Sequence, residues 1–127
     1  MRVHRQVPGF TLIELLVVMA IISLLISLAV PRYFGGLAKA KETALQQTLT
    51  ATRDSIDKFF GDTGKYPENL EALVTNRYLR SLPLDPMTES STTWTVVPPD
   101  NPEKGGVYDI HSTAEGVGRN GKPFKEW

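Results

Sequence analysis

The sequence contains no cysteine, only two histidines and no net charge. Without cysteine there is no disulfide, no thiol nucleophile and no zinc site of the cysteine-rich type. The 14 basic and 14 acidic residues cancel, so no basic surplus indicates a nucleic-acid partner and no acidic surplus indicates a disordered tail. The 127 residues suffice for one folded domain, whose stability has to come from packing or from a partner.

Long apolar runs, in contrast, are present near the N-terminus. From Phe10 to Val30 there are 21 residues, and Glu14 is the only charged one. As a helix at about 1.5 Å per residue, this run is roughly 31 Å long, the thickness of the hydrocarbon core of a bilayer. The sequence therefore predicts one membrane-spanning helix, with Arg2 and Arg5 on its cytoplasmic side and the C-terminal residues outside.

A cleavable secretory signal is the alternative interpretation of this N-terminus. The apolar run is longer than the usual length of about 7–15 residues. Its exit, Leu28-Ala29-Val30-Pro31-Arg32, contains no small-x-small cleavage site. The small residue Gly9 instead precedes the run, so cleavage there would leave the membrane segment on the mature chain.

Glu14 is costly inside a membrane segment, by about 2.5–3.5 kcal/mol at mid-bilayer. It lies only four residues inside the run, so its side chain can extend to the headgroup region. The other solution is an opposite charge with hydrogen-bond donors from a partner. Position alone does not decide between the two.

The residues Gly9-Phe10-Thr11-Leu12-Ile13-Glu14 resemble the processing site of type IV prepilins and of type II secretion pseudopilins. The resemblance implies that a prepilin peptidase cuts between Gly9 and Phe10 and methylates the new N-terminus at Phe10. It also implies that Glu14 pairs with the N-terminal amine of a neighbouring subunit during assembly. The family carries a proline where this chain has Pro31, which implies a bend within one long helix.

Apolar residues recur at steps of three and four beyond Pro31, which predicts that the helix continues to about Phe60. The pair Gly35-Gly36 weakens this helix and allows local melting. Gly61 is the expected left-handed cap. The apolar stripe that should pack on a sheet consists of Leu45, Leu49, Thr52, Ile56 and Phe59.

The C-terminal half changes to a β pattern after a short predicted helix over 68–76. Strands are expected over 92–97 and 106–111, and a last short strand in the glycine-rich segment 115–127. Phe124 and Trp127 should dock this segment onto the sheet. The fold class is α+β and similar to type IV pilins, with about three antiparallel strands. Its parts are a leader 1–9, a transmembrane and filament-core helix 10–30, a second helical half 31–61 and an α/β head domain 62–127.

Nothing in the sequence indicates catalysis, and we expect no enzyme. His111 is the only histidine outside the leader, and sequence adjacency to Asp109 and Ser112 does not make a triad. The stretch 116–121 matches Gly-x-Gly-x-x-Gly but follows no βαβ pattern and opens no helix, so it is read as a turn.

The resemblance to the major pseudopilin of type II secretion, which holds calcium in its C-terminal loop, implies a candidate calcium site here. Calcium takes six to eight oxygen ligands, usually with two or more carboxylates. The candidates here are Asp109, Ser112, Glu115 and Asn120, but only Glu115 is a carboxylate within the loop. Arg119 beside them would repel a cation, so we expect no cofactor.

The leading hypothesis is a structural subunit of a periplasmic pseudopilus that helps to export folded proteins through type II secretion. It would span the inner membrane once, with a cytoplasmic N-terminus and a periplasmic C-terminal domain. Its expected partners are copies of itself, other pseudopilins, prepilin peptidase, the inner-membrane assembly platform and lipid. A type IV pilus subunit for adhesion, motility or DNA uptake shares the same N-terminal half. A tethered periplasmic enzyme or binding module is the third hypothesis, and it gives Gly9 and Glu14 no role.

Overall fold

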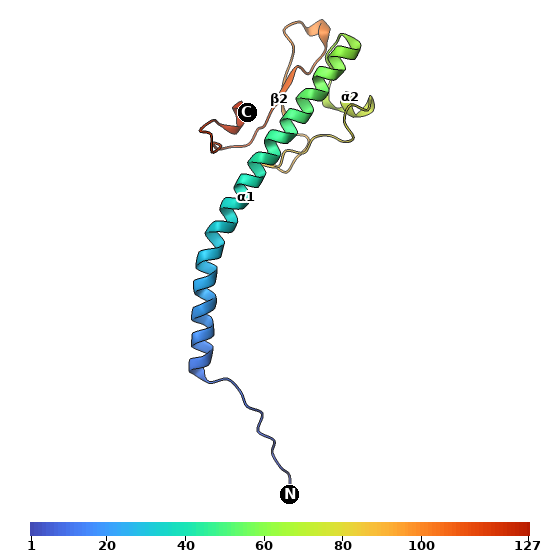
Figure 1. The fold of residues 1–127 in the computed structure, drawn as a ribbon. Coiled ribbons are helices and arrows are strands. Elements are labelled where there is room, and N and C mark those ends of the chain that lie inside the picture. The colour runs from blue at the N-terminus through green and yellow to red at the C-terminus, as the bar shows by residue number, and fades with distance from the viewer. The chain divides into compact units, whose positions relative to one another are not determined.

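The computed structural model describes all 127 residues, which form two compact units, Met1–Ala38 and Lys39–Trp127 (Figure 1). The long helix α1, Leu12–Thr63, contributes its first part to one unit and its second part to the other. A small antiparallel sheet lies in the second unit. The predicted α+β class is therefore confirmed.

The first unit consists of an irregular segment and the N-terminal part of α1. Residues 1–11 form no helix or strand, and α1 begins at Leu12. Every residue of this unit is exposed, although most of its helical residues are apolar. One stretch of α1 is apolar and long enough to cross a membrane, and none of that stretch is buried. The unit has no core of its own.

Neither Pro31 nor the pair Gly35-Gly36 interrupts α1. Pro31 has no backbone N–H, so the Ser27 carbonyl, four residues earlier, has no helical donor there. Continuation past Pro31 confirms the prediction of one long helix, and the bend at this residue stays a prediction. The local melting that Gly35-Gly36 would allow is not seen, because both glycines are helical. A glycine costs about 1 kcal/mol in a helix, too little to stop one that propagates from both sides.

The helix ends three residues later than predicted. Gly61 is still helical, and the left-handed residue is Gly64, with a φ of 74°. The Gly64 N–H donates to the Phe60 carbonyl at 2.8 Å, and the Thr63 hydroxyl donates to the Phe59 carbonyl at 2.7 Å. These bonds satisfy the last carbonyls of α1, which is why the end falls at Thr63 and not at Phe60.

The second unit packs short elements against the C-terminal part of α1 (Figure 1). Its two strands pair antiparallel, with Val96 opposite Ile110 at the centre. The Asn69 side chain caps the following helix by accepting from the Ala72 N–H at 2.8 Å. The elements after α1 are α2 (Leu70–Thr75), β1 (Thr95–Val97), the 3-10 turn η1 (Pro102–Lys104), β2 (Asp109–His111) and the 3-10 turn η2 (Phe124–Glu126).

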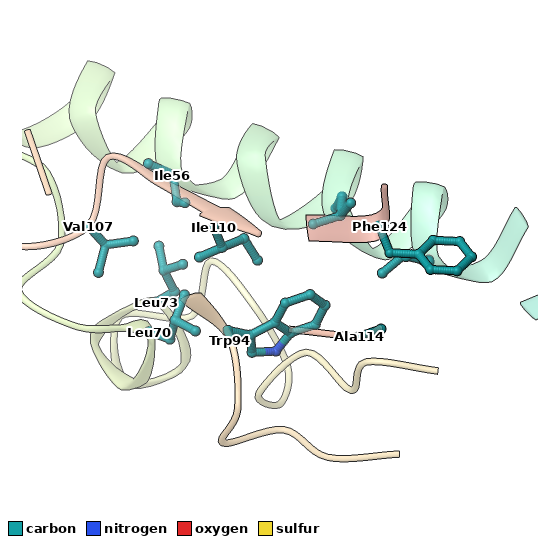
Figure 2. Close-up of a cluster of buried hydrophobic side chains, with 10 residues drawn as sticks. Ile56, Leu70, Leu73, Trp94, Val107, Ile110, Ala114 and Phe124 are labelled. Atoms are coloured by element: carbon teal, nitrogen blue, oxygen red, sulfur yellow. The ribbon is translucent and has the colours of Figure 1, made fainter. Parts of the chain in front are cut away.

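The core of the second unit lies between α1, α2 and the strands (Figure 2). The predicted stripe on α1 is confirmed, since its residues are buried or pack against the core. Val107 and Ile110 both face inward, because regular pairing begins only at Asp109. The buried apolar residues are Leu45, Leu49, Ile56, Leu70, Leu73, Trp94, Val107, Ile110, Ala114 and Phe124.

The sheet has two strands where the sequence predicts about three, and both strands are shorter than expected. Before β2, the N–H groups of Gly106 and Val107 donate to the Pro67 carbonyl, at 3.0 and 2.9 Å. They therefore do not pair with β1. In the C-terminal segment, Val117 and Pro123 form only an isolated bridge, followed by η2. Proline has no N–H, so a strand cannot continue pairing there.

Docking of the C-terminal segment onto the core is confirmed. Phe124 is buried, and its ring lies 5.1 Å from that of Trp127. The Trp127 indole N–H donates to the Lys122 carbonyl at 3.1 Å. The predicted turn at 116–121 is also present, with positive φ angles at Gly116 and Gly121.

Candidate functional site

The first turn of α1 is closed by a reciprocal pair of hydrogen bonds between Thr11 and Glu14. The Thr11 N–H donates to Glu14 Oε2 at 2.8 Å, and the Glu14 N–H donates to Thr11 Oγ1 at 3.2 Å. This arrangement is a capping box, and it satisfies two N–H groups that a helix start leaves without partners. The positive end of the helix dipole also favours a carboxylate at this position.

Thr11 is a residue that the sequence analysis missed. The spacing Thr-x-x-Glu before an apolar run is the sequence pattern of a capping box, so the signal was present. It also explains why α1 begins at Leu12 and not at Phe10, since the Thr11 side chain ends the non-helical segment. The Glu14 carboxylate therefore has a partner within its own chain.

Gly9 and Phe10 lie in an open segment immediately before this cap. Neither belongs to a helix or strand, and Phe10 is 89% exposed. A Cβ added to Gly9 would meet no atom within 4 Å. The fold of this chain thus imposes no demand for glycine at position 9, and the peptide bond after it is accessible.

A shallow hollow at the same end of α1 combines one carboxylate with apolar side chains. It is lined by Phe10, Ile13, Glu14, Val17 and Val18. The carboxylate can attract a positive charge here, and because all the lining residues are exposed, water is excluded from the pair only when a partner covers them.

The exposed apolar surface continues along the rest of the N-terminal part of α1. Large apolar residues occur on all sides of the helix and not in one stripe. A helix that is apolar all round is stable only in lipid or within other protein. These residues include Leu12, Ile13, Leu16, Val17, Met19, Ile21, Leu24, Leu25, Ile26, Leu28 and Leu37.

The calcium candidates are distributed among separate interactions. Asp109 Oδ1 accepts from Arg53 Nε at 2.7 Å, and the Ser112 hydroxyl donates to Asp85 Oδ2 at 2.5 Å. Asn120 Oδ1 accepts from the Lys122 N–H at 3.0 Å. No three histidine or acidic side chains come together in a way that could hold a metal. The residues present do not fit a calcium site.

Glu115, the remaining candidate, is paired with Lys125 at 2.9 Å. The hydrogen bond from Lys125, assisted by its charge, lowers the pKa of the Glu115 carboxyl. The carboxylate is largely exposed, so it is held by this one cation near the surface.

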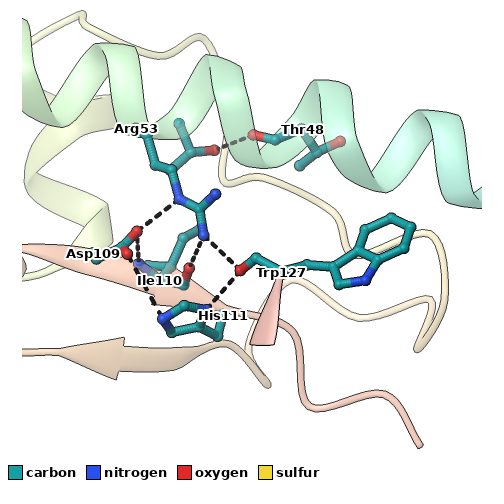
Figure 3. A network of polar contacts seen from close by, with 7 residues as sticks. Thr48, Arg53, Asp109, Ile110, His111 and Trp127 are labelled. Carbon is teal, nitrogen blue, oxygen red and sulfur yellow. Dashed lines mark hydrogen bonds and ion pairs between the residues drawn. The ribbon is translucent and has the colours of Figure 1, made fainter. Parts of the chain in front are cut away.

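Arg53 occupies the place where β2 and the C-terminal segment meet α1 (Figure 3). Its guanidinium contacts Asp109 and the main-chain oxygens of Ile110 and Trp127. The sequence places Arg53 on α1 beside the apolar stripe, but no pattern identifies these partners, which are 56 or more positions away.

His111 is a neighbour of this cluster and has no nucleophile beside it. Its Nδ1 lies 2.6 Å from the Trp127 main-chain oxygen, and its Nε2 lies 3.6 Å from Asp109 Oδ2. Ser112 donates to Asp85 and not to the histidine. The residues 109, 111 and 112 therefore do not form a catalytic relay.

Comparison with known proteins adds two findings. The family model for the prokaryotic N-terminal methylation motif matches residues 5–30. The chain is also similar to several curated proteins named type II secretion system core protein G. No solved structure matches the chain.

Three of these relatives cover different shares of the chain. The protein of Pectobacterium carotovorum subsp. carotovorum is 32% identical over 139 residues, which covers 97% of this chain and 82% of the relative. That of Escherichia coli K12 is 31% identical over 128 residues, with coverage of 88% and 84%. That of Pseudomonas aeruginosa is 35% identical over 99 residues, with coverage of 65% and 70%.

Proposed function

Because this chain belongs to the type II secretion system core protein G family of pseudopilins, we propose that it is a structural subunit of a periplasmic pseudopilus. The observation that carries the proposal is the first unit. There, an accessible Gly9–Phe10 bond, a capped Glu14 and an unburied apolar helix follow one another. A subunit of this kind works by assembly and not by chemistry, and it supports the export of folded proteins.

Processing by a prepilin peptidase is the first proposed step. Hydrolysis of the bond between Gly9 and Phe10 removes the leader and frees the Phe10 amine. A methyl donor then transfers one methyl group to this amine in exchange for a proton, so the amine remains basic and positively charged. The match of the methylation motif to residues 5–30 supports this step. The absence of any contact that needs glycine at position 9 supports it too, because the requirement then lies with a binding partner.

Assembly through Glu14 is the second step. The amine created at Phe10 of one subunit is the partner proposed for the Glu14 carboxylate of its neighbour. The apolar side chains around Glu14 support such a pairing, since a neighbouring subunit that covers them would exclude water from the two charges and strengthen their attraction. Until that contact forms, the Thr11 N–H keeps the carboxylate hydrogen-bonded at the start of α1.

The inner membrane is the proposed location before assembly. The apolar part of α1 spans the bilayer once, with the leader in the cytoplasm and the second unit in the periplasm. The proposed partners are copies of the chain, other pseudopilins, the assembly platform and membrane lipid. In the filament, the apolar helices leave the lipid and pack against one another.

A type IV pilus subunit would use the same N-terminal half. It is less well supported, because the similarity to core protein G extends over 97% of the chain for one relative and 88% for another. The similarity thus includes the second unit, where the two classes of subunit differ.

The mass of the mature protein tests the processing step. In cells with prepilin peptidase we expect loss of residues 1–9 and a gain of one methyl group, and in cells without it the full precursor. Gly9→Val should block the cut. Gly36→Val is the matched control, because a side chain at either glycine meets open space, and it should be processed normally. A mature chain that begins after Ala29 would contradict the proposal.

A further inference from the structure

We propose that Arg53 supplies the positive charge that closes the C-terminal segment, residues 112–127, onto α1, so that this segment folds without bound calcium. The proposal goes beyond assembly, and it does not depend on how the chain is processed. It concerns the part of the molecule where the family resemblance leads one to look for a metal.

Three oxygens converge on the Arg53 guanidinium (Figure 3). Nε donates to Asp109 Oδ1 at 2.7 Å, while Nη2 donates to the Ile110 carbonyl at 3.0 Å and to the Trp127 main-chain oxygen at 2.7 Å. One carboxylate and two main-chain oxygens are the ligand types that calcium takes. Here they surround a side-chain cation whose planar fork of donors fixes their directions.

These contacts connect parts of the chain that are distant in sequence. Arg53 lies on α1, Asp109 and Ile110 lie on β2, and Trp127 follows η2. His111 contributes a second contact to the Trp127 main-chain oxygen, at 2.6 Å. A single charged group therefore joins the helix, the sheet and the end of the segment, which is the mechanical role that a structural metal ion has.

Two other carboxylates beside the segment have side-chain cations of their own, whereas Asp85 accepts from neutral donors, the Ser112 hydroxyl and the Met87 N–H. Lys125 pairs with Glu115 at 2.9 Å, and Arg119 lies 3.9 Å from Glu42. Together with Arg53 and Asp109, each of these three acidic residues faces a basic residue. Such a charge balance disfavours a divalent cation, which would have to displace the basic groups before it could bind.

Apolar contacts complete the closure. Phe124 is buried in the core, and the Trp127 indole packs so closely on Gly118 that a Cβ there would collide with it. The backbone amide protons of 116–127 consequently report on whether the segment is closed.

A calcium titration of the full chain in detergent micelles tests the proposal directly. Thermal unfolding is followed with EDTA and with millimolar calcium chloride. We expect the two Tm values to agree within about 1 °C. If the chain had a calcium site, a calcium concentration about 100 times the Kd of that site would raise Tm by about 10 °C or more. Saturable calcium binding in calorimetry, accompanied by such a rise, would overturn the proposal.

Hydrogen exchange of the segment tests the role of Arg53. Arg53→Gln should accelerate exchange of the 116–127 amides by about tenfold or more, because a charge-assisted bond to three oxygens is lost. Arg53→Lys keeps the positive charge but lacks the planar set of guanidinium donors, and it should give a smaller increase in the exchange rate. Lys125→Gln is the control, since it removes only an exposed pair and should leave exchange almost unchanged.

The two measurements together leave the proposal open to refutation. Unchanged exchange in Arg53→Gln would contradict it, and so would slower exchange of the unmodified chain when calcium is added. If Arg53→Gln fails to fold, the Arg53→Lys variant and the calcium titration of the unmodified chain still decide.

Discussion

At the scale of single residues, Glu14 has two roles that can be separated. Within the chain it accepts a hydrogen bond from the Thr11 N–H, which an uncharged side chain can also accept. In a filament, the proposed partner is a cation, which requires the charge. A substitution that retains the acceptor and removes the charge therefore tests assembly without disturbing the start of α1.

Glu14→Gln should leave helix content unchanged and reduce filament formation by about tenfold or more. Removal of one partner of a buried ion pair costs about 3–5 kcal/mol, which is more than enough for this loss. Filaments in the periplasmic fraction are counted by electron microscopy, and helix content is measured by circular dichroism. Glu103→Gln, at an exposed turn, is the control, and normal filaments in Glu14→Gln would contradict the pairing.

The Tyr78 hydroxyl gives a prediction about pH. It donates to Asp62 Oδ2 at 2.6 Å, and this hydrogen bond, with smaller contributions from burial and charge, raises the pKa of the phenol. The folded state thus favours the protonated form. Its contribution to stability is fully present below the ordinary tyrosine pKa near 10 and is lost as pH rises through the higher folded value.

Spectrophotometric titration of tyrosinate checks this prediction. Asp62→Asn should return the Tyr78 pKa toward its ordinary value, because the charged acceptor is gone. The other three tyrosines remain as an internal reference. Titration curves that coincide for both proteins would show that Asp62 does not determine this pKa.

Some residues were accessible from the sequence and others were not. Glu14 is visible as the only charge in an apolar run, and Thr11 could have been found by its spacing from Glu14. Arg53 could not, because its partners depend on how distant segments meet. The separation of the calcium candidates was inaccessible for the same reason: four oxygen-bearing residues close in sequence bind to four different partners in space.

At the scale of elements, glycine is needed where two segments of backbone pass close together. Gly106, just before β2, lies against Glu68, which follows α1. A Cβ at Gly106 would collide with the main-chain carbonyl of Glu68, and the Gly106 N–H bonds to the Pro67 carbonyl. Backbone cannot move aside as a flexible side chain can. This close approach sets where β2 begins.

Gly106→Ala should therefore lower the free energy of unfolding by about 1–3 kcal/mol. The matched control is Gly61→Ala, which lies within α1 and meets open space. It should raise the free energy by about 0.5–1 kcal/mol, because alanine favours the helix. Urea unfolding of both variants measures the difference, and equal stabilities would refute the packing argument.

Element types were predictable where one periodicity persists for many residues. The long apolar run and the stripe from Leu45 to Phe59 both indicate α1, and its continuation through Pro31 follows from the same pattern. The ends were less accessible, because Thr11 and Gly64 fix them by local hydrogen bonds. The third strand failed because Pro123 and several glycines favour a turn, although the neighbouring aromatic residues resemble a strand.

At the scale of the whole molecule, the two units have opposite solvent requirements. The second unit has its own core of ten buried apolar residues, whereas the first exposes every residue. Residues 39–127 alone should thus be monomeric and folded in water, while the full chain should require detergent or lipid. Sedimentation and near-UV circular dichroism measure this. An unfolded fragment would show that the second unit depends on the first.

Thr11 and Glu14 also leave part of the carboxylate open. The Thr11 N–H bonds to Glu14 Oε2, and a carboxylate offers about four acceptor sites on its two oxygens. A cation can therefore bind Oε1 while the cap that starts α1 stays in place. One side chain can thus order its own helix and contact another chain at the same time, so that assembly does not require the end of α1 to unfold.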